Sequence, residues 1–241
     1  MPSVTFASCA QQRPARREPR LNGRGAPPES GAHTGINLRE NFLRMTSFPG
    51  DLRSSVREVY SAAAERPGEK HPFPVGRQFA ESVGYSLEQL AWIPAHSLEA
   101  FTGVSNVSMF ASVPDGGTVL DLGCGGGLDS LVAARRVGPS GRVFGIDFSS
   151  SMLERARRSA SELNFRNLVF LQADAERLPI RTSSVDTVLV NGIFNLNPCR
   201  EAIFQELARV ARPGGAVYAA ELILRAPLPP GDRTEAADWF S

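Results

Sequence analysis

The chain has 241 residues, of which 42% are hydrophobic and 21% charged, a composition that suits an enzyme-sized globular protein with one substantial core, arranged as one domain with a tail or as two domains. The formal net charge of +1 is uneven: residues 1–44 hold seven arginines against three acids, a balance of +4, which leaves −3 for the remainder. A near-neutral body argues against nucleic acid as the main partner. No apolar run reaches the roughly 18 to 20 residues that a membrane-spanning helix needs, so we expect no membrane partner.

Three cysteines, Cys9, Cys124 and Cys199, are widely spaced and form no CxxC motif. The pattern therefore indicates neither a disulfide framework nor a zinc site, and we expect no bound metal. A reducing, cytoplasmic compartment fits this cysteine usage best.

Residues 1–50 are rich in Arg, Pro, Gly and Ser and show no apolar periodicity, which predicts a disordered extension. An Arg-rich, acid-poor leader is also typical of an organellar transit peptide, although proline and glycine are scattered through this one. The composition changes at Met45, so a true start at Met45 is a further hypothesis.

The segment 51–112 predicts helices. Apolar residues recur at three- and four-residue spacing over residues 51–67 and predict an amphipathic helix with one buried stripe. A second, short helix begins at Ser86, because Ser86 and Gln89 have the spacing of a capping box. These helices are too small to form a core of their own, so we expect them to pack over the functional site as a cap.

Residues 118–127, read TVLDLGCGGG, are the most informative stretch of the chain. A β-type apolar run with Asp121 near its end opens into three glycines at alternate positions, where the backbone can adopt φ > 0 or approach a ligand closely. A helical pattern follows over residues 128–137. Strand, glycine loop and helix in this order are the layout of a nucleotide-type site.

The alternation of strands and helices continues to the end of the chain. A helix capped by Ser151 and Glu154 follows the second strand, another helix begins at Asn197, and residues 212–215 turn the chain into the last strand. The four further strands are predicted over residues 142–148, 168–173, 185–190 and 216–224. Near-continuous apolar strands separated by helices predict a doubly wound, parallel, Rossmann-like α/β sheet with helices on both faces and a ligand crevice at the carboxyl ends of its strands.

Two acids coincide with the glycine loop at that edge. Asp147 ends the second strand, where a carboxylate can accept hydrogen bonds from a ribose diol, and Asp174 follows the third strand, where it could accept from an adenine amine. Met152 is placed to flank the ring, but it serves equally well as helix core. A P-loop is excluded because Leu128 follows the glycines instead of a GK[ST] motif, and an acid at Asp121 suits a ligand that carries an ammonium group.

Four segments, DLGCGGG, GIDFSSSML, DAERLP and RPGG, resemble those of class I S-adenosylmethionine-dependent methyltransferases over roughly residues 75–241. The resemblance implies S-adenosyl-L-methionine as the cofactor. It also implies that the glycines pass beneath its methionyl part and that the acids hold its amino group, ribose and adenine. The predicted cofactor-binding residues are Asp121, Gly123, Cys124, Gly125, Gly127, Asp147, Phe148, Met152, Asp174, Ala175 and Asn191.

Three further segments, 84–90, 102–106 and 191–198, resemble the arsenite methyltransferase branch of that family. The branch holds trivalent arsenic on cysteine thiolates in these segments, whereas this chain has Val104 and Gly192 at the matching positions. Soft thiolate ligation is therefore missing. We expect an arsenite-methyltransferase-like enzyme that acts on a different small molecule, with Tyr85 and Asn195 as candidate substrate contacts.

The sulfonium of such a cofactor is already activated, so the protein mainly needs to align the nucleophile and exclude water. No strong general base is required, and no catalytic residue is assigned. His71 and His96 lie in the cap and are expected to be structural or solvent-exposed, while Asn191 and Glu221 are further candidates to line the pocket.

In the resembled family, the fifth strand is followed by a helix and an antiparallel pair of strands. This chain ends at Ser241, so we expect the methyltransferase domain, residues 113–241, to be incomplete at its C-terminus, truncated before the last two strands. One alternative is a non-catalytic methyltransferase-like module that binds a partner through the open edge of the sheet. An NAD-dependent oxidoreductase is a second alternative, which the absent GxGxxG fingerprint disfavours.

Overall fold

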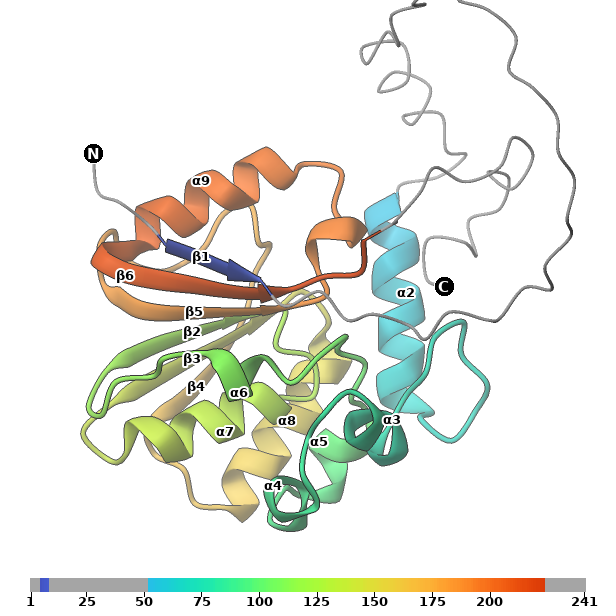
Figure 1. The fold of residues 1–241 in the computed structure, drawn as a ribbon. Helices are drawn as coiled ribbons and strands as arrows, with labels where there is room; N and C mark the ends of the chain where they lie inside the picture. The colour runs from blue at the N-terminus through green and yellow to red at the C-terminus, as the bar shows by residue number, and fades with distance from the viewer. Residues whose placement is uncertain (1–4, 9–51, 224–241) are drawn as a thin grey trace, which may run out of the picture.

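A computed structural model describes residues 5–8 and 52–223 of the chain (Figure 1). In these ranges the strands are β1 (Thr5–Ser8), β2 (Thr118–Leu122), β3 (Arg142–Asp147), β4 (Leu168–Gln172), β5 (Val185–Asn191) and β6 (Ala211–Ala220). They form one parallel sheet in the order β1-β6-β5-β2-β3-β4. The chain runs outward from β2 to β4 and then returns to the other side of β2. The strand order therefore reverses between β2 and β5, and the ligand crevice of such a sheet lies at this point.

Helices cover both faces of the sheet, with α7 and α8 on one face and α9 on the other (Figure 1). The helices are α2 (Leu52–Glu65), α3 (Arg77–Ser82), α4 (Leu87–Ala91), α5 (Ala95–Glu99), α6 (Val107–Phe110), α7 (Leu128–Val137), α8 (Ser150–Glu162) and α9 (Arg200–Val210), with the 3-10 turn η1 (Phe194–Leu196). The predicted doubly wound α/β sheet is thus confirmed.

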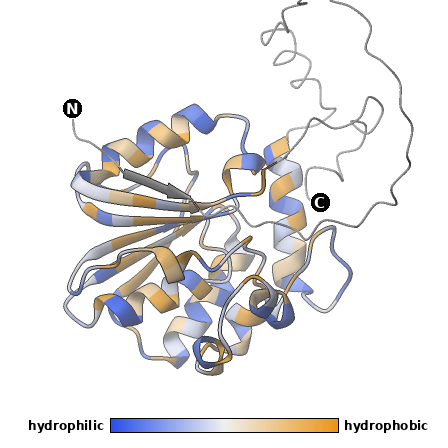
Figure 2. Cartoon of the chain, in the orientation of Figure 1, coloured by the Kyte–Doolittle hydropathy of each residue, from blue (hydrophilic) through white to orange (hydrophobic). Residues whose placement is uncertain are grey.

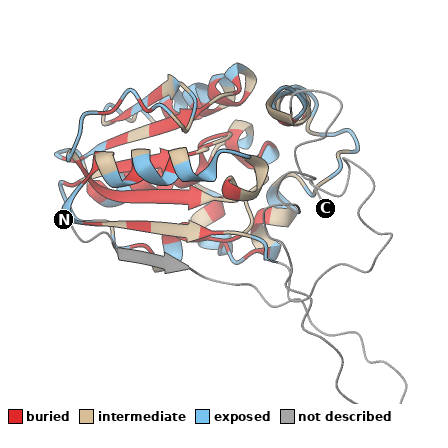
Figure 3. Ribbon diagram, turned by 90° about the horizontal axis from the view of Figure 1, so that it is seen from above, coloured by how far each residue is buried: buried red, intermediate tan, exposed pale blue. Residues whose placement is uncertain are grey.

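The sheet has a hydrophobic core on each face because side chains alternate along a strand. In β2, Val119 packs in the core beneath α7 and α8, while its neighbour Leu120 packs in the core beneath α9. Hydrophobic residues run along the strands (Figure 2), and the strands are largely buried (Figure 3). Burial on both faces explains why the strands read as nearly continuous apolar runs.

Of two predicted helix N-caps, the one at Ser86 is confirmed and the one at Ser151 is wrong. Ser86 and Gln89 form the predicted capping box, with Gln89 N donating to Ser86 Oγ at 3.1 Å and Ser86 N donating to Gln89 Oε1 at 3.0 Å. The cap of α8 is Ser149 and not the predicted Ser151, because Ser149 keeps an extended backbone and its Oγ accepts from Met152 N at 3.3 Å.

Strand β6 begins earlier than predicted. Residues 212–215, expected to form a turn, belong to the strand, whose pairing with β5 shifts register between Val185 and Thr187. Gly214 has φ of +82°, a conformation that glycine adopts without strain. The irregularity thus accommodates the RPGG segment inside the strand.

Of the cap helices, α2 lies at the carboxyl ends of the strands, whereas α6 packs against α7, β5 and β6. Helix α2 stands across that edge (Figure 1) and is seen end-on beside it in Figure 3. It is anchored to α8 through a small apolar cluster in which Ala63 and Ala64 pack with Ala100 and Met152. None of the helices in the described ranges is long and apolar enough to cross a membrane.

The expectation of a disordered N-terminal extension is corrected at four residues. Thr5–Ser8 form β1, which pairs in parallel with β6, with Thr5 opposite Ala216 and Ser8 opposite Ala219. The physical reason is that β6 offers an edge whose backbone groups need partners. The remainder of residues 1–50, including Cys9 and the start proposed at Met45, lies outside the described residues. So does the chain after residue 223, where the predicted truncation falls.

Candidate functional site

A cleft opens at the carboxyl ends of β2, β3 and β5, between the glycine loop and α2. Seven of the predicted cofactor-binding residues line it: Gly123, Gly125, Asp147, Phe148, Asp174, Ala175 and Asn191. Residues that the sequence analysis did not predict also line it, among them Arg53, Val56, Arg57, Tyr60, Thr102, Glu176, Gly192 and Ile193. The cleft therefore lies at the point where the strand order reverses.

Asp147, the last residue of β3, is 7% exposed at the base of this cleft. One carboxylate oxygen accepts a hydrogen bond from Gly125 N at 2.8 Å and the other accepts from Ser149 N at 2.8 Å. Burial raises the pKa of Asp147, and these backbone hydrogen bonds oppose that shift. Each oxygen keeps further acceptor capacity, which fits the two hydroxyl donors of a ribose diol.

The glycine loop is held by its backbone. Gly123 N and Cys124 N both donate to Ile146 O, at 2.8 and 3.0 Å. Gly127 has φ of +86°, and a Cβ built there would lie 2.9 Å from Ala156 Cβ on α8. Gly127 is therefore needed for close packing of the loop on α8, whereas Gly123 and Gly125 line the cleft.

The opposite side of the cleft is formed by two arginines of α2. Arg53 pairs with Glu176. The Arg57 guanidinium lies 5.5 Å from the centre of the Phe148 ring and 4.0 Å from the Asp174 carboxylate. Their four-residue spacing places both arginines on one helix face. Their partners lie more than 90 residues away in the chain, and the sequence does not predict these contacts.

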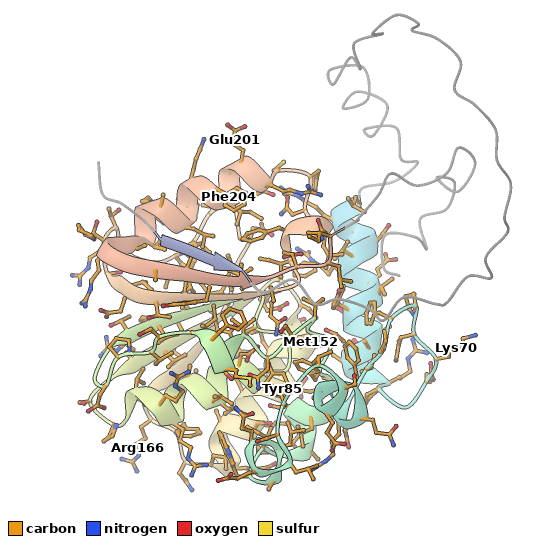
Figure 4. The ribbon with its side chains drawn as sticks, viewed as in Figure 1. Lys70, Tyr85, Met152, Arg166, Glu201 and Phe204 are labelled. Atoms are coloured by element: carbon orange, nitrogen blue, oxygen red, sulfur yellow. The ribbon has the colours of Figure 1, made fainter. Side chains whose placement is uncertain are left out.

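Besides Gly127, three further predicted cofactor residues do not line the cleft, because their side chains are buried. Asp121 is 2% exposed and accepts from Ser130 Oγ at 2.5 Å; burial and the nearby Asp129 raise the pKa of Asp121 to about 8. Burial also raises the pKa of the Cys124 thiol. Met152 packs near α2 (Figure 4), in the helix-core position that was the alternative for it.

The two candidate substrate contacts lie outside the cleft lining. The buried Tyr85 (Figure 4) donates its hydroxyl hydrogen to Asp129 Oδ1 at 2.7 Å, and Asn195 Nδ2 donates to Leu222 O at 2.6 Å. Glu221 accepts from Phe194 N at 2.7 Å, so this carboxylate caps η1.

Both cap histidines are also away from the cleft. His71 Nε2 contacts Arg66 O at 2.9 Å, and His96 Nε2 lies 3.2 Å from a Glu162 carboxylate oxygen. Neither histidine is placed to act on a ligand in the cleft.

Val104 and Gly192, the two positions at which the resemblance led us to look for arsenic-binding cysteines, lie close together in space. A Cβ built on Gly192 would lie 3.0 Å from Val104 Cγ1. Of the two cysteines in the described ranges, Cys124 is buried and Cys199 is exposed. Those same ranges contain no group of three or more His, Cys, Asp or Glu side chains that could hold a metal ion.

Comparison with known proteins agrees with this geometry. A family profile described as a methyltransferase domain matches residues 114–240. An arsenite methyltransferase of Halobacterium salinarum is 30% identical over 244 aligned positions, which cover 88% of this chain and 62% of the relative. A demethylmenaquinone methyltransferase of Lactococcus lactis is 39% identical over 104 positions, 43% of this chain and 41% of the relative.

The same relationship is found among solved structures. The crystal structure of an arsenic (III) S-adenosylmethionine methyltransferase from Chlamydomonas reinhardtii superposes with a TM-score of 0.50 at 33% identity, over 54% of this chain and 46% of that one. The chain spans less than two thirds of the length of each of these relatives. The resemblance to S-adenosylmethionine-dependent methyltransferases is confirmed, and the chain belongs to the methyltransferase domain family.

Proposed function

We propose that this chain binds S-adenosylmethionine in the cleft between the glycine loop and α2, and that it methylates a small-molecule acceptor other than arsenite. The observation that carries the proposal is the buried Asp147 carboxylate, held by Gly125 N and Ser149 N at the strand-order reversal. When bound, the cofactor supplies a methyl group that its sulfonium has already activated for attack.

The cleft residues fit the parts of this cofactor. Asp147 would accept from the ribose hydroxyls, and the exposed Asp174 from the adenine amine. Phe148 would pack against the ring, and Gly123 and Gly125 would pass beneath the methionyl part, where the absence of side chains leaves room. Helix α2 lies on the other side of the cleft, where it would cover the bound cofactor and exclude water from the reacting groups.

The side of the cleft that Thr102, Asn191 and Gly192 line, called the acceptor side below, argues against arsenite as the acceptor. Gly192 lines this side and Val104 packs against it, and neither carries a thiolate that would hold a soft metalloid ion. Alignment of an acceptor with a lone pair of its own is sufficient, because the leaving group needs no protonation. The protein's task is therefore to position the acceptor.

Isothermal titration calorimetry tests the proposal. The full chain is titrated with S-adenosylmethionine, S-adenosylhomocysteine and NAD+ in parallel. We expect saturable single-site binding of the two sulfur compounds and none of NAD+, and we expect Asp147→Ala to weaken the binding by about 100-fold or more. Asp115→Ala is the matched control, because Asp115 is an exposed acid with no place in the cleft.

Other outcomes would overturn the proposal. Binding of NAD+ in place of the sulfur compounds would support an oxidoreductase. A folded chain that binds none of the three would support a non-catalytic module. Unchanged binding in Asp147→Ala would place the ligand elsewhere.

A further inference from the structure

A buried polar cluster lies behind the acceptor side of the cleft and reaches it through one member, Asn191, which lines the cleft. Its centre is Asp129 in the first turn of α7, which is 5% exposed. Asp129 Oδ1 accepts from the Tyr85 hydroxyl at 2.7 Å, and Oδ2 accepts from Asn191 Nδ2 at 2.9 Å. The cluster thus joins the cap, α7 and the end of β5.

The Asn191 side chain uses both ends of its amide. Its Oδ1 accepts from Val104 N at 2.8 Å and from Ser105 N at 3.2 Å, while its Nδ2 donates to Ser105 O at 2.8 Å as well as to Asp129. The Asp129 carboxylate offers only acceptors to the amide, so the amide nitrogen must face it. The amide oxygen is thereby turned toward the two backbone N–H groups.

This orientation fixes a wall of the cleft. Asn191, Gly192 and Thr102 all line the cleft, and the backbone of residues 103–105 lies directly against the Asn191 side chain. A Cβ built on Gly103 would lie 2.5 Å from Asn191 Nδ2, so only glycine permits this approach. The position of this wall therefore depends on the orientation of the Asn191 amide, which in turn depends on the Asp129 carboxylate.

We propose that Asp129 is a positioning residue that never touches a ligand. Through Asn191 it holds the segment 103–105 and thereby the adjoining Thr102, which lines the acceptor side of the cleft together with Asn191 and Gly192. The inference rests on the proposed function in treating this wall as one that contacts ligands.

Tyr85 completes the cluster from the cap side. Burial and the Asp129 carboxylate raise the pKa of Tyr85 well above its usual value, so its hydroxyl keeps the proton that it donates. Its ring packs edge-on against Phe101, with centroids 5.1 Å apart. Tyr85 therefore holds the Asp129 carboxylate in place and donates to it directly, without a bridging water.

The test is amide hydrogen exchange in Asp129→Asn, measured without any ligand. Only one end of the new amide can accept. Its nitrogen faces either Asn191 Nδ2, which must then flip or withdraw, or the Tyr85 oxygen, whose hydrogen must then turn to Ser105 O, 3.4 Å away, and compete there with Asn191 Nδ2. We expect exchange at Val104 N and Ser105 N to rise by about tenfold or more. Exchange at buried sheet amides such as Leu120 N should not change, and S-adenosylhomocysteine should bind more weakly.

The exchanged pair Asp129→Asn/Asn191→Asp supplies the rescue. It restores a donor at 129 facing an acceptor at 191, whose second oxygen can again accept from Val104 N and Ser105 N. It loses the bond to Ser105 O, so we expect recovery of part of the protection and a more stable protein than either single variant, as a double-mutant cycle measures.

Three results would overturn the inference: unchanged exchange in Asp129→Asn, an equal rise at Leu120 N, or an exchanged pair no better than the single variants. A failure of this kind is distinct from failure of the proposed function, because the exchange measurement involves no cofactor. Conversely, a chain that binds no S-adenosylmethionine could still show the exchange pattern.

Discussion

The two sides of the cleft are built in different ways. On the sheet side, backbone groups hold the geometry: Gly123 N and Gly125 N are both engaged, and Asp147 is almost completely buried. On the α2 side, contact across the cleft depends on long side chains, and the Arg57 and Asp174 side chains are 55% and 59% exposed.

This difference has consequences for ligand binding. Buried, charge-assisted hydrogen bonds contribute more free energy than exposed ion pairs, which water and salt weaken. We therefore expect the sheet side to determine affinity and α2 to determine how easily the cleft opens. The comparison would be refuted if α2 determined the affinity and the sheet side determined how easily the cleft opens.

The largest effect is expected from two acids at the carboxyl ends of the strands, of which Asp147 is buried and Asp174 is exposed and pairs with Arg57 of α2. Asp147→Ala should weaken S-adenosylhomocysteine binding by about 100-fold or more, because it removes a buried carboxylate. Asp174→Ala should weaken it only about threefold, since that carboxylate is exposed and already shared with Arg57. Calorimetry measures both affinities. Equal losses in the two variants would contradict the comparison.

Glycine substitutions test how rigidly the loop is packed. Gly127→Ala combines a left-handed backbone with a Cβ placed 2.9 Å from Ala156, so we expect about 2 to 4 kcal/mol of lost stability in urea unfolding. Gly214→Ala, at φ of +82° with nothing within 4 Å, should cost only about 1 kcal/mol of backbone strain. Gly68→Ala, with open space and no positive φ, is the neutral control.

The buried Asp121 makes a prediction about pH. Its pKa rises from 3.8 to about 8 on folding, so the folded chain binds a proton there that the unfolded chain lacks. This contribution to stability is complete below about pH 4 and is lost as the pH rises toward 8. Thermal unfolding of Asp121→Asn should therefore lose less stability than the wild type between pH 5 and 8.

Asp129 and Asp147 have pKa values shifted in the same direction, and both remain in that variant. The difference between the two pH profiles consequently reports Asp121 together with its interaction with these two neighbouring carboxylates. Parallel profiles would show that the Asp121 carboxyl is ionised in the folded protein.

The smallest effect is expected on the α2 side. Arg57→Ala removes an exposed ion pair and a cation–π contact, so we expect affinity to fall by about two- to fivefold, with faster dissociation in stopped-flow measurements. High salt should reduce the wild-type affinity more than that of the variant. A loss as large as that of Asp147→Ala would assign α2 a main role in binding.

The sheet side is also the part that the sequence reveals. Helix α7 spans the predicted residues 128–137, because its signals act between residues close in the chain. The capping box at Ser86, in the cap, formed for the same reason. The acid at Asp147 was found because a parallel sheet brings all carboxyl ends of its strands to one edge. Local pattern and topology were sufficient for these features.

The α2 side depends on distant contacts, and the sequence does not contain them in readable form. Helix α2 was predicted, but the partnership of Arg53 with Glu176 joins residues 123 positions apart. Tyr85 was predicted to contact the substrate, but in the structure its hydroxyl donates to Asp129. The two residues meet only because the cap packs on α7. The polar cluster around Asp129 was missed for the same reason.

The most direct measurement is hydrogen exchange of the full chain with and without S-adenosylhomocysteine. If the ligand lies between the glycine loop and α2, protection should increase at residues 123–127 and 147–149 and also at residues 53–60. Protection that is absent from these segments, or confined to the opposite edge of the sheet around Arg142 and Arg166, would contradict a ligand site in this cleft.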